Sequence, residues 1–159
     1  MTDYVVEAKP AIIEQSRGML LKIMGVGLVI GLLTFGLALL IQHFILKGLI
    51  CNGDAYCSDG VMYSGNIASI ILSIFAVLVL VRISSFRPLL IVLASVVSLW
   101  GLSTWLAGLG TLEVAVWYGV AFALAYGTFS WLARIRSVPV MVIAIVVVVL
   151  ALRVISVYA

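Results

Sequence analysis

The chain has 159 residues and a formal net charge of +3; 65% of its residues are hydrophobic and only 9% are charged. An ordinary water-soluble domain is about 45 to 50% apolar and has enough charged residues to cover its outside, so this composition excludes that class. The charged residues form short clusters between long uncharged runs. These features predict an all-α integral membrane protein. The mild positive charge follows from membrane topology, so we expect no nucleic-acid partner.

Five uncharged runs are long enough to cross a bilayer as helices, since a hydrocarbon core of about 30 Å requires about 20 helical residues. The first run has about 24 residues, whereas the apolar core of a cleaved signal peptide has about 7 to 15. Residues 1–22 are expected to form a cytoplasmic or interfacial N-terminal segment, ahead of a transmembrane domain over 23–159 with an outer loop at 48–61. The predicted helices cover residues 23–46, 62–81, 88–109, 114–133 and 138–158.

Basic residues predict the orientation, because short loops rich in Lys and Arg stay on the cytoplasmic side. Five spans then give a cytoplasmic N-terminus and an external C-terminus. A prokaryotic plasma membrane is the expected location, since Asn52 and Asn66 are not followed by the Ser or Thr that a glycosylation site requires. Seven of the nine basic residues lie on the predicted inner side: Lys9, Arg17, Lys22, Arg82, Arg87, Arg134 and Arg136.

The two predicted inner turns resemble each other. Residues 81–88 (VRISSFRP) align with residues 133–139 (ARIRSVP) when one residue is deleted. The similarity predicts a duplicated helical hairpin, with the second and third helices matching the fourth and fifth, as in the parallel repeats of some transporters. The alternative is that any inner turn requires Arg for orientation and Pro to begin a helix. The sequence favours the two interpretations equally.

Small residues at four-residue spacing predict where the helices pack closely. Apolar side chains gain little by leaving lipid for one another, so membrane helices associate through small residues that let their backbones approach. An oligomer interface would have the same pattern, but packing within the chain is favoured. The predicted packing residues are Gly27, Gly31, Gly119, Ala123 and Gly127.

Few residues stand out as candidates for function. Cys51 and Cys57 lie in the predicted outer loop, where thiols are oxidised, so we expect a structural disulfide rather than a redox pair. Arg153 lies about 21 Å into the last helix. Its side chain is expected to extend outward to the membrane surface, with contact to an anionic lipid head group or a partner's carboxylate as the alternative. We expect His43 to be solvated and Asn66 to form an interhelical hydrogen bond.

The sequence contains no zinc-ligand spacing, phosphate-binding glycine loop or Ser-His-Asp set. We therefore expect a non-enzymatic protein without metal or cofactor, acting as a subunit or assembly partner of a larger membrane complex. Its partners would be the lipid bilayer and other membrane proteins or copies of itself. The alternative is a small transporter or channel for a neutral or lipophilic solute, acting as an oligomer. Its polar lining would come from Ser95, Ser98, Ser103, Thr104, Tyr118, Tyr126, Thr128 and Ser130.

Overall fold

The computed structural model describes residues 16–44, 57–83, 85, 87–106 and 108–158, with only the backbone of residues 57–62 and 155–158. The all-α prediction is confirmed over these residues. Four helical segments are long and apolar enough to span a membrane, namely Arg17–Phe44, Tyr63–Arg82, Pro88–Trp105 and Thr111–Leu132, and Val138–Val154 is shorter. The helices are α1 (Arg17–Ile41), α2 (Cys57–Arg82), α3 (Pro88–Ser98), α4 (Leu102–Trp105), α5 (Thr111–Leu132) and α6 (Val138–Tyr158).

Two helices begin earlier than the uncharged runs indicate. Residues 17–22, predicted to belong to the N-terminal segment, form the first turns of α1, and α2 begins inside the predicted outer loop. Ser16 caps α1, because its hydroxyl accepts a hydrogen bond from the Met19 amide at 3.3 Å. A basic residue ends an uncharged run in the sequence. It does not end the helix, because its long side chain extends toward water. Residues 1–15 and 45–56 lie outside the described part of the chain.

The predicted third helix, residues 88–109, is interrupted in the structure, although Pro88–Trp105 as a whole is long and apolar enough to span a membrane. α3 ends at Ser98 and the single turn α4 begins at Leu102. Between them Gly101 has φ +82°, in the left-handed region that glycine adopts without steric cost. An apolar run with one internal glycine has the hydropathy of an intact helix, so hydropathy alone did not reveal this break.

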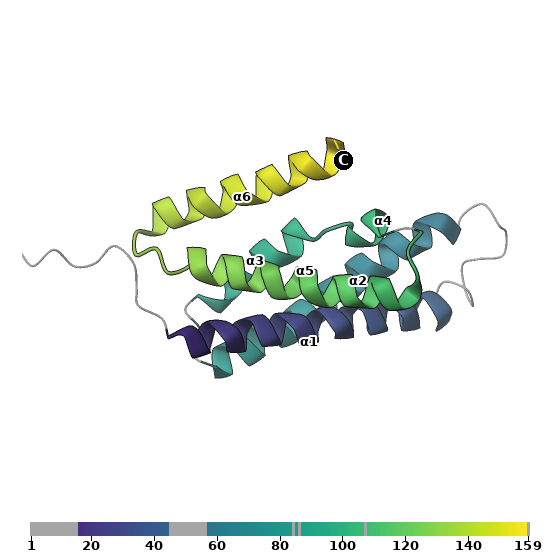
Figure 1. Cartoon of the computed structure of the whole chain (residues 1–159), viewed down its shortest axis with the longest axis horizontal. Coiled ribbons are helices and arrows are strands. Elements are labelled where there is room, and N and C mark those ends of the chain that lie inside the picture. The colour runs from purple at the N-terminus through teal and green to yellow at the C-terminus, as the bar shows by residue number, and fades with distance from the viewer. Residues whose placement is uncertain (1–15, 45–56, 84, 86, 107, 159) are drawn as a thin grey trace, which may run out of the picture.

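α6 lies along one side of the bundle that the other long helices form (Figure 1). α1 packs extensively against α5 and α2, whereas α6 makes sparse contacts with α3 and α5. The two predicted hairpins therefore differ, because α2 and α3 pack together more closely than α5 and α6 do. α1, α3 and α6 begin at the same end of the bundle (Figure 1). The helix bounds put the described basic residues predicted on the inner side in or next to the helix ends there: Arg17, Lys22, Arg82, Arg87, Arg134 and Arg136.

Two glycines of α1 bring its backbone against that of α5. A Cβ added at Gly27 would lie 2.7 Å from the carbonyl oxygen of Phe122, and one added at Gly31 would overlap the carbonyl of Tyr118. Real Cβ atoms do not approach backbone oxygens so closely. Only glycine fits at these two positions of the α1–α5 contact.

Small residues of α5 face the same contact. A Cβ at Gly127 would lie 2.9 Å from Cγ of Met24, and one at Gly119 would lie 3.4 Å from Leu32. The Cα of Ala123 lies 3.0 Å from the Cβ position of Gly27. The structure therefore brings the predicted packing residues of α1 and α5 together at one interface within the chain.

Aromatic rings of α5 fill the space beside this interface. Tyr118, Phe122 and Tyr126 follow one another at one-turn spacing, with ring centroids 6.4 Å apart in each successive pair. Phe35 of α1 adds a further ring, 5.8 Å from that of Tyr118. The three α5 rings are almost completely buried. The middle of the bundle is thus filled with side chains.

The outward faces of the helices are apolar. Ile74 of α2 and Ile143 of α6 are each 63% exposed, and Leu124 of α5 is 56% exposed. Large aliphatic side chains at such exposure are unfavourable in water at about 25 cal/mol per Å². A contiguous apolar surface of this kind is typical of proteins that face lipid or other proteins.

Replacing Gly31 by Leu should destabilise the bundle by about 1 to 3 kcal/mol, because the new side chain collides with the backbone of α5. The free energy of unfolding can be measured by circular dichroism during titration of a mild detergent with sodium dodecyl sulfate. Gly25→Leu is the matched control, since a Cβ at Gly25 meets nothing within 4 Å. An equal decrease in the free energy of unfolding in the two variants would contradict the α1–α5 contact.

Candidate functional site

The break between α3 and α4 exposes backbone groups that a continuous helix would satisfy. Arg153 of α6 supplies partners for two of them, since its Nη2 donates to the Val97 carbonyl at 2.7 Å and its Nη1 to the Trp100 carbonyl at 2.8 Å. Asn66 of α2 supplies a third, as its Oδ1 accepts from the Gly101 amide at 3.3 Å. The interhelical hydrogen bond predicted for Asn66 is therefore confirmed. Irregular backbone among apolar side chains requires such internal partners.

Three hydroxyl groups near the break bond to backbone carbonyls three or four residues earlier in the chain. Ser95 and Ser98 each donate to the carbonyl four residues earlier, both at 2.7 Å, and Thr104 donates to the Gly101 carbonyl at 2.7 Å. Such bonds return a polar side chain to its own backbone and often bend the helix. The local sequence is thus compatible with a helix that stops at this point.

A small polar cluster lies next to the break, where α2, α4 and α5 meet. A Cβ at Gly65 would lie 3.1 Å from the Tyr118 hydroxyl and 3.4 Å from the Ser103 hydroxyl. The absence of a side chain at Gly65 therefore makes room for both hydroxyls. Together with Asn66 and Arg153 they gather polar groups at one level of an otherwise apolar bundle.

An apolar cleft of about 290 Å³ separates α3 from α6. Leu93, Ala94 and Val97 are among the residues of α3 that line it, and Val146 and Val149 are among those of α6. The lining contributes only apolar surface. The cleft begins next to the helix break, because Val97 both lines the cleft and accepts a hydrogen bond from α6.

A second arginine joins α6 to the bundle at its other end. Nη1 of Arg87 lies 2.8 Å from the sulfur of Met141 and donates to the carbonyl of Ile135 over a long 3.4 Å. Arg87 has φ +55°, which is uncommon for a residue other than glycine, and it directly precedes Pro88. The two predicted inner turns therefore contact each other. Arginine contacts near both ends of α6 leave the apolar cleft between them.

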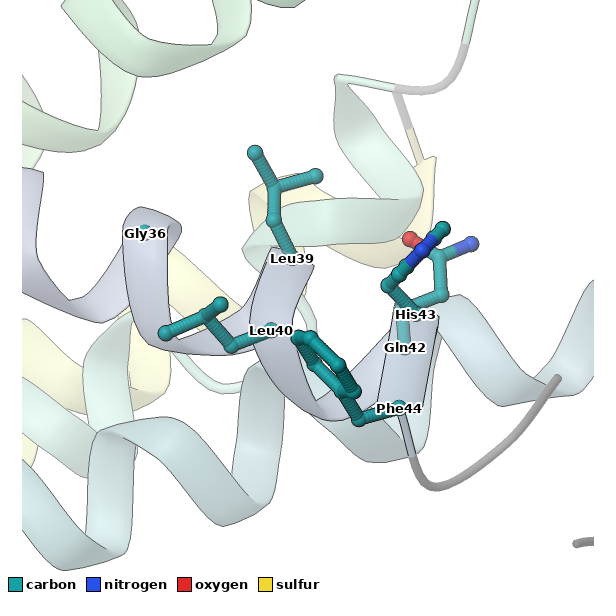
Figure 2. A pocket seen from close by; sticks show the side chains of 6 residues that line it. All are labelled: Gly36, Leu39, Leu40, Gln42, His43 and Phe44. Atoms are coloured by element: carbon teal, nitrogen blue, oxygen red, sulfur yellow. The ribbon is translucent and has the colours of Figure 1, made fainter. Parts of the chain in front are cut away.

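Another hollow, of about 440 Å³, lies at the end of α1 (Figure 2). All of its lining residues belong to α1 or to the turn that follows it, including Leu39, Gln42 and Phe44. The His43 ring is exposed and meets the Phe44 ring edge to face, with centroids 5.4 Å apart. Because one helix alone lines this hollow, it is a feature of the helix surface rather than a site enclosed by several elements.

The remaining predicted residues are not gathered into one site. Cys51 lies outside the described residues, as does the side chain of Cys57, so the predicted disulfide stays a prediction. Of the proposed polar lining of a transporter, Thr104 and Thr128 are exposed on the outside, while the other residues are buried or half-buried. Within the described residues, no three His, Cys, Asp or Glu side chains are placed to hold a metal ion.

Sequence reasoning missed the partners of Arg153. The prediction offered the membrane surface, a lipid head group or a partner carboxylate, whereas the guanidinium reaches two carbonyls at the end of α3. A cation near a helix C-terminus interacts favourably with the carbonyls there. The one sequence feature that could have indicated these partners is Gly101, which lies inside the third apolar run at a depth similar to that of Arg153.

Replacing Arg153 by Gln should lower the free energy of unfolding in detergent micelles by about 1.5 to 3 kcal/mol, because two charge-assisted hydrogen bonds to backbone carbonyls are lost. Arg153→Lys should lower the free energy of unfolding by less, because an ammonium retains the charge but cannot form the two parallel hydrogen bonds of a guanidinium. Arg136→Gln removes an exposed charge outside the cleft and should change stability little. Wild-type stability for Arg153→Gln would contradict the role of Arg153 in joining α6 to α3.

Comparison with known proteins yields no family model, no curated protein and no solved structure that matches this chain. Function must therefore be inferred from the geometry of the helices, the break and the cleft.

Proposed function

We propose that this chain is a non-enzymatic, multi-pass membrane protein that acts as a subunit or interaction partner of a larger membrane complex. The supporting observation is the filled interior of the bundle. Gly27 and Gly31 place α1 directly on the backbone of α5, and three successive buried rings of α5 occupy the adjoining space. A bundle packed in this way offers its outer surface for function, and that surface is apolar enough to contact lipid or other membrane helices.

The proposed orientation places the N-terminus in the cytoplasm and the C-terminus outside, in the plasma membrane of a prokaryote. Its support is the grouping of the described basic residues other than Arg153 at one end of the bundle, because basic turns are retained in the cytoplasm. Trp105 is exposed on α4, which lies toward the opposite end of the bundle (Figure 1), as in an interfacial aromatic belt. The duplication of the two hairpins stays a prediction, and their different packing gives it no support.

The proposed orientation places Cys51 and Cys57 outside the cytoplasm. We infer that they form a disulfide, which would stabilise the outer loop by about 2 kcal/mol in the chain-entropy model. A membrane-impermeant maleimide applied to intact cells should label neither thiol before reduction and both after it. Labelling of both without reduction would contradict the disulfide, and protection from label after reduction would contradict the sidedness.

A second candidate function is transport by an oligomer of this chain. The observation that favours it is the interruption between α3 and α4, because discontinuous helices often line the binding sites of transporters. Here, however, the backbone groups at the break already bond to Asn66 and Arg153. The break therefore supports transport less strongly than the filled interior supports an interaction protein.

Extraction of the membrane in polymer-bound lipid discs, followed by native mass measurement, distinguishes the two proposals. The interaction proposal predicts a particle that contains this chain and a different membrane protein in a fixed ratio. Gly31→Leu should disrupt that ratio, because it disturbs the bundle, while Gly25→Leu should preserve it. A homo-oligomer enclosing a pore would favour transport, and a lone monomer would contradict both proposals.

A further inference from the structure

The two ends of the bundle differ in charge. Seven of the nine basic residues belong to the predicted inner side, the end at which α1, α3 and α6 begin (Figure 1). The acidic residues of the N-terminal segment are Asp3, Glu7 and Glu14, so the net charge of the inner side is +4 even when all three are counted. The remaining two basic and three acidic residues give the outer side a net charge of −1. The positive charge of the chain is therefore concentrated at its inner end.

Four basic side chains are exposed in or next to the helix ends there, and we call them the inner cations: Arg17, Lys22, Arg82 and Arg136. They come from the first turns of α1, the last residue of α2 and the turn between α5 and α6. Arg87 joins two of these segments, because its Nη1 donates to the carbonyl of Ile135 at 3.4 Å. Of the side chains that the structure describes, only Glu113 carries a carboxylate, and it lies in the first turn of α5, at the other end of the bundle.

The inner cations lie at the depth where hydrocarbon gives way to lipid head groups. The apolar helix Tyr63–Arg82 has 20 residues and is therefore about 30 Å long, which matches a hydrocarbon core. Arg82 is its last residue, and Arg136 lies between two helices. Aliphatic residues beside the cations are exposed too, among them Leu21 and Val81. This surface thus offers apolar contact to acyl chains and positive charge to phosphate groups, which are the two parts of an anionic phospholipid.

We propose that the inner cations gather anionic phospholipids around the inner end of the bundle, in the leaflet that surrounds it. The proposal rests on the membrane location proposed above and adds a lipid class to it. Basic residues next to membrane helices are attracted to anionic head groups, and lysine and arginine form charge-assisted hydrogen bonds with phosphate oxygens. An acidic segment of a soluble protein would match the charge but would leave the neighbouring aliphatic side chains uncovered.

Tryptophan fluorescence in vesicles tests the proposal, because the chain carries an exposed tryptophan toward each end of the bundle. Trp131 lies in the last turn of α5, and Trp105 lies on α4, toward the opposite end (Figure 1). Two full-length chains keep one of these each, with the other three tryptophans replaced by phenylalanine. The vesicles contain equal parts of phosphatidylcholine and phosphatidylglycerol with identical acyl chains. One lipid at a time is brominated, so that it quenches nearby tryptophan.

Brominated phosphatidylglycerol should quench Trp131 more strongly than brominated phosphatidylcholine, with an enrichment of about fivefold, as for one basic residue near an anionic surface. Trp105 should show no such preference. Salt at about 1 M should weaken the preference at Trp131, because it screens charges beyond about 3 Å. Replacing all four inner cations by glutamine should abolish it. The matched control exchanges lysine and arginine at the same four positions, which retains every charge, and should keep the preference.

Equal quenching of Trp131 by the two lipids, or a preference that survives the four glutamines, would overturn the proposal while leaving the membrane location intact. The same preference at Trp105 would overturn it too, since the inner cations would not be its cause. Absence of quenching by either lipid would overturn both the proposal and the membrane location. Circular dichroism identifies any variant that loses helix. If the fourfold variant does so, the pair Arg82→Gln and Arg136→Gln takes its place and should lower the preference.

Discussion

Backbone polar groups surrounded by apolar side chains must find partners within the protein, and this constraint governs the whole structure. Long helices satisfy it internally, which explains why the uncharged runs form helices despite their many β-branched residues. Several serines and threonines obey it too: the hydroxyls of Thr34 and Ser95, for example, donate to carbonyls one turn earlier. Where α3 ends, the side chains of Asn66 and Arg153 supply hydrogen bonds to the backbone that the helix itself does not provide. Hydrogen bonds with α2 and α6 therefore stabilise the break.

The same apolar surroundings determine how the helices associate. In lipid, contact between leucine side chains gains little over contact with acyl chains, so close backbone approach has to provide the attraction. α1 and α5 achieve it through Gly27 and Gly31 on one side and small residues on the other. α6 has no comparable approach. It is joined to the bundle through arginines near its ends, which leaves the apolar cleft beside α3.

The sequence was sufficient to predict features that depend on one helix at a time. Hydropathy located the helices, and four-residue spacing identified the small residues that meet between α1 and α5. The break at Gly101 could not be predicted in this way, because an internal glycine scarcely changes hydropathy. The partners of Arg153 could not be predicted either, since they depend on how α6 lies against α3. The cleft depends on the same tertiary arrangement, so no local sequence pattern predicts it.

The proposed function follows from which surfaces remain available. The interior is occupied by packed rings and by backbone contact, and backbone groups at the break already bond to Asn66 and Arg153. The outer surface is left, together with the cleft at its edge. A membrane protein of this design would act through what binds to its outside, whether another protein or a lipid.

Accessibility of nitroxide labels tests most directly whether hydrocarbon surrounds the helices. Labels at Ile74, Leu124 and Ile143, in a chain whose two cysteines are replaced by serine, would be examined in vesicles with molecular oxygen and with a polar nickel chelate. The account predicts that oxygen reaches all three and that the chelate reaches none, while a label at Arg136 shows the reverse preference. Collision of the chelate with the three helix labels as readily as with the label at Arg136 would contradict it.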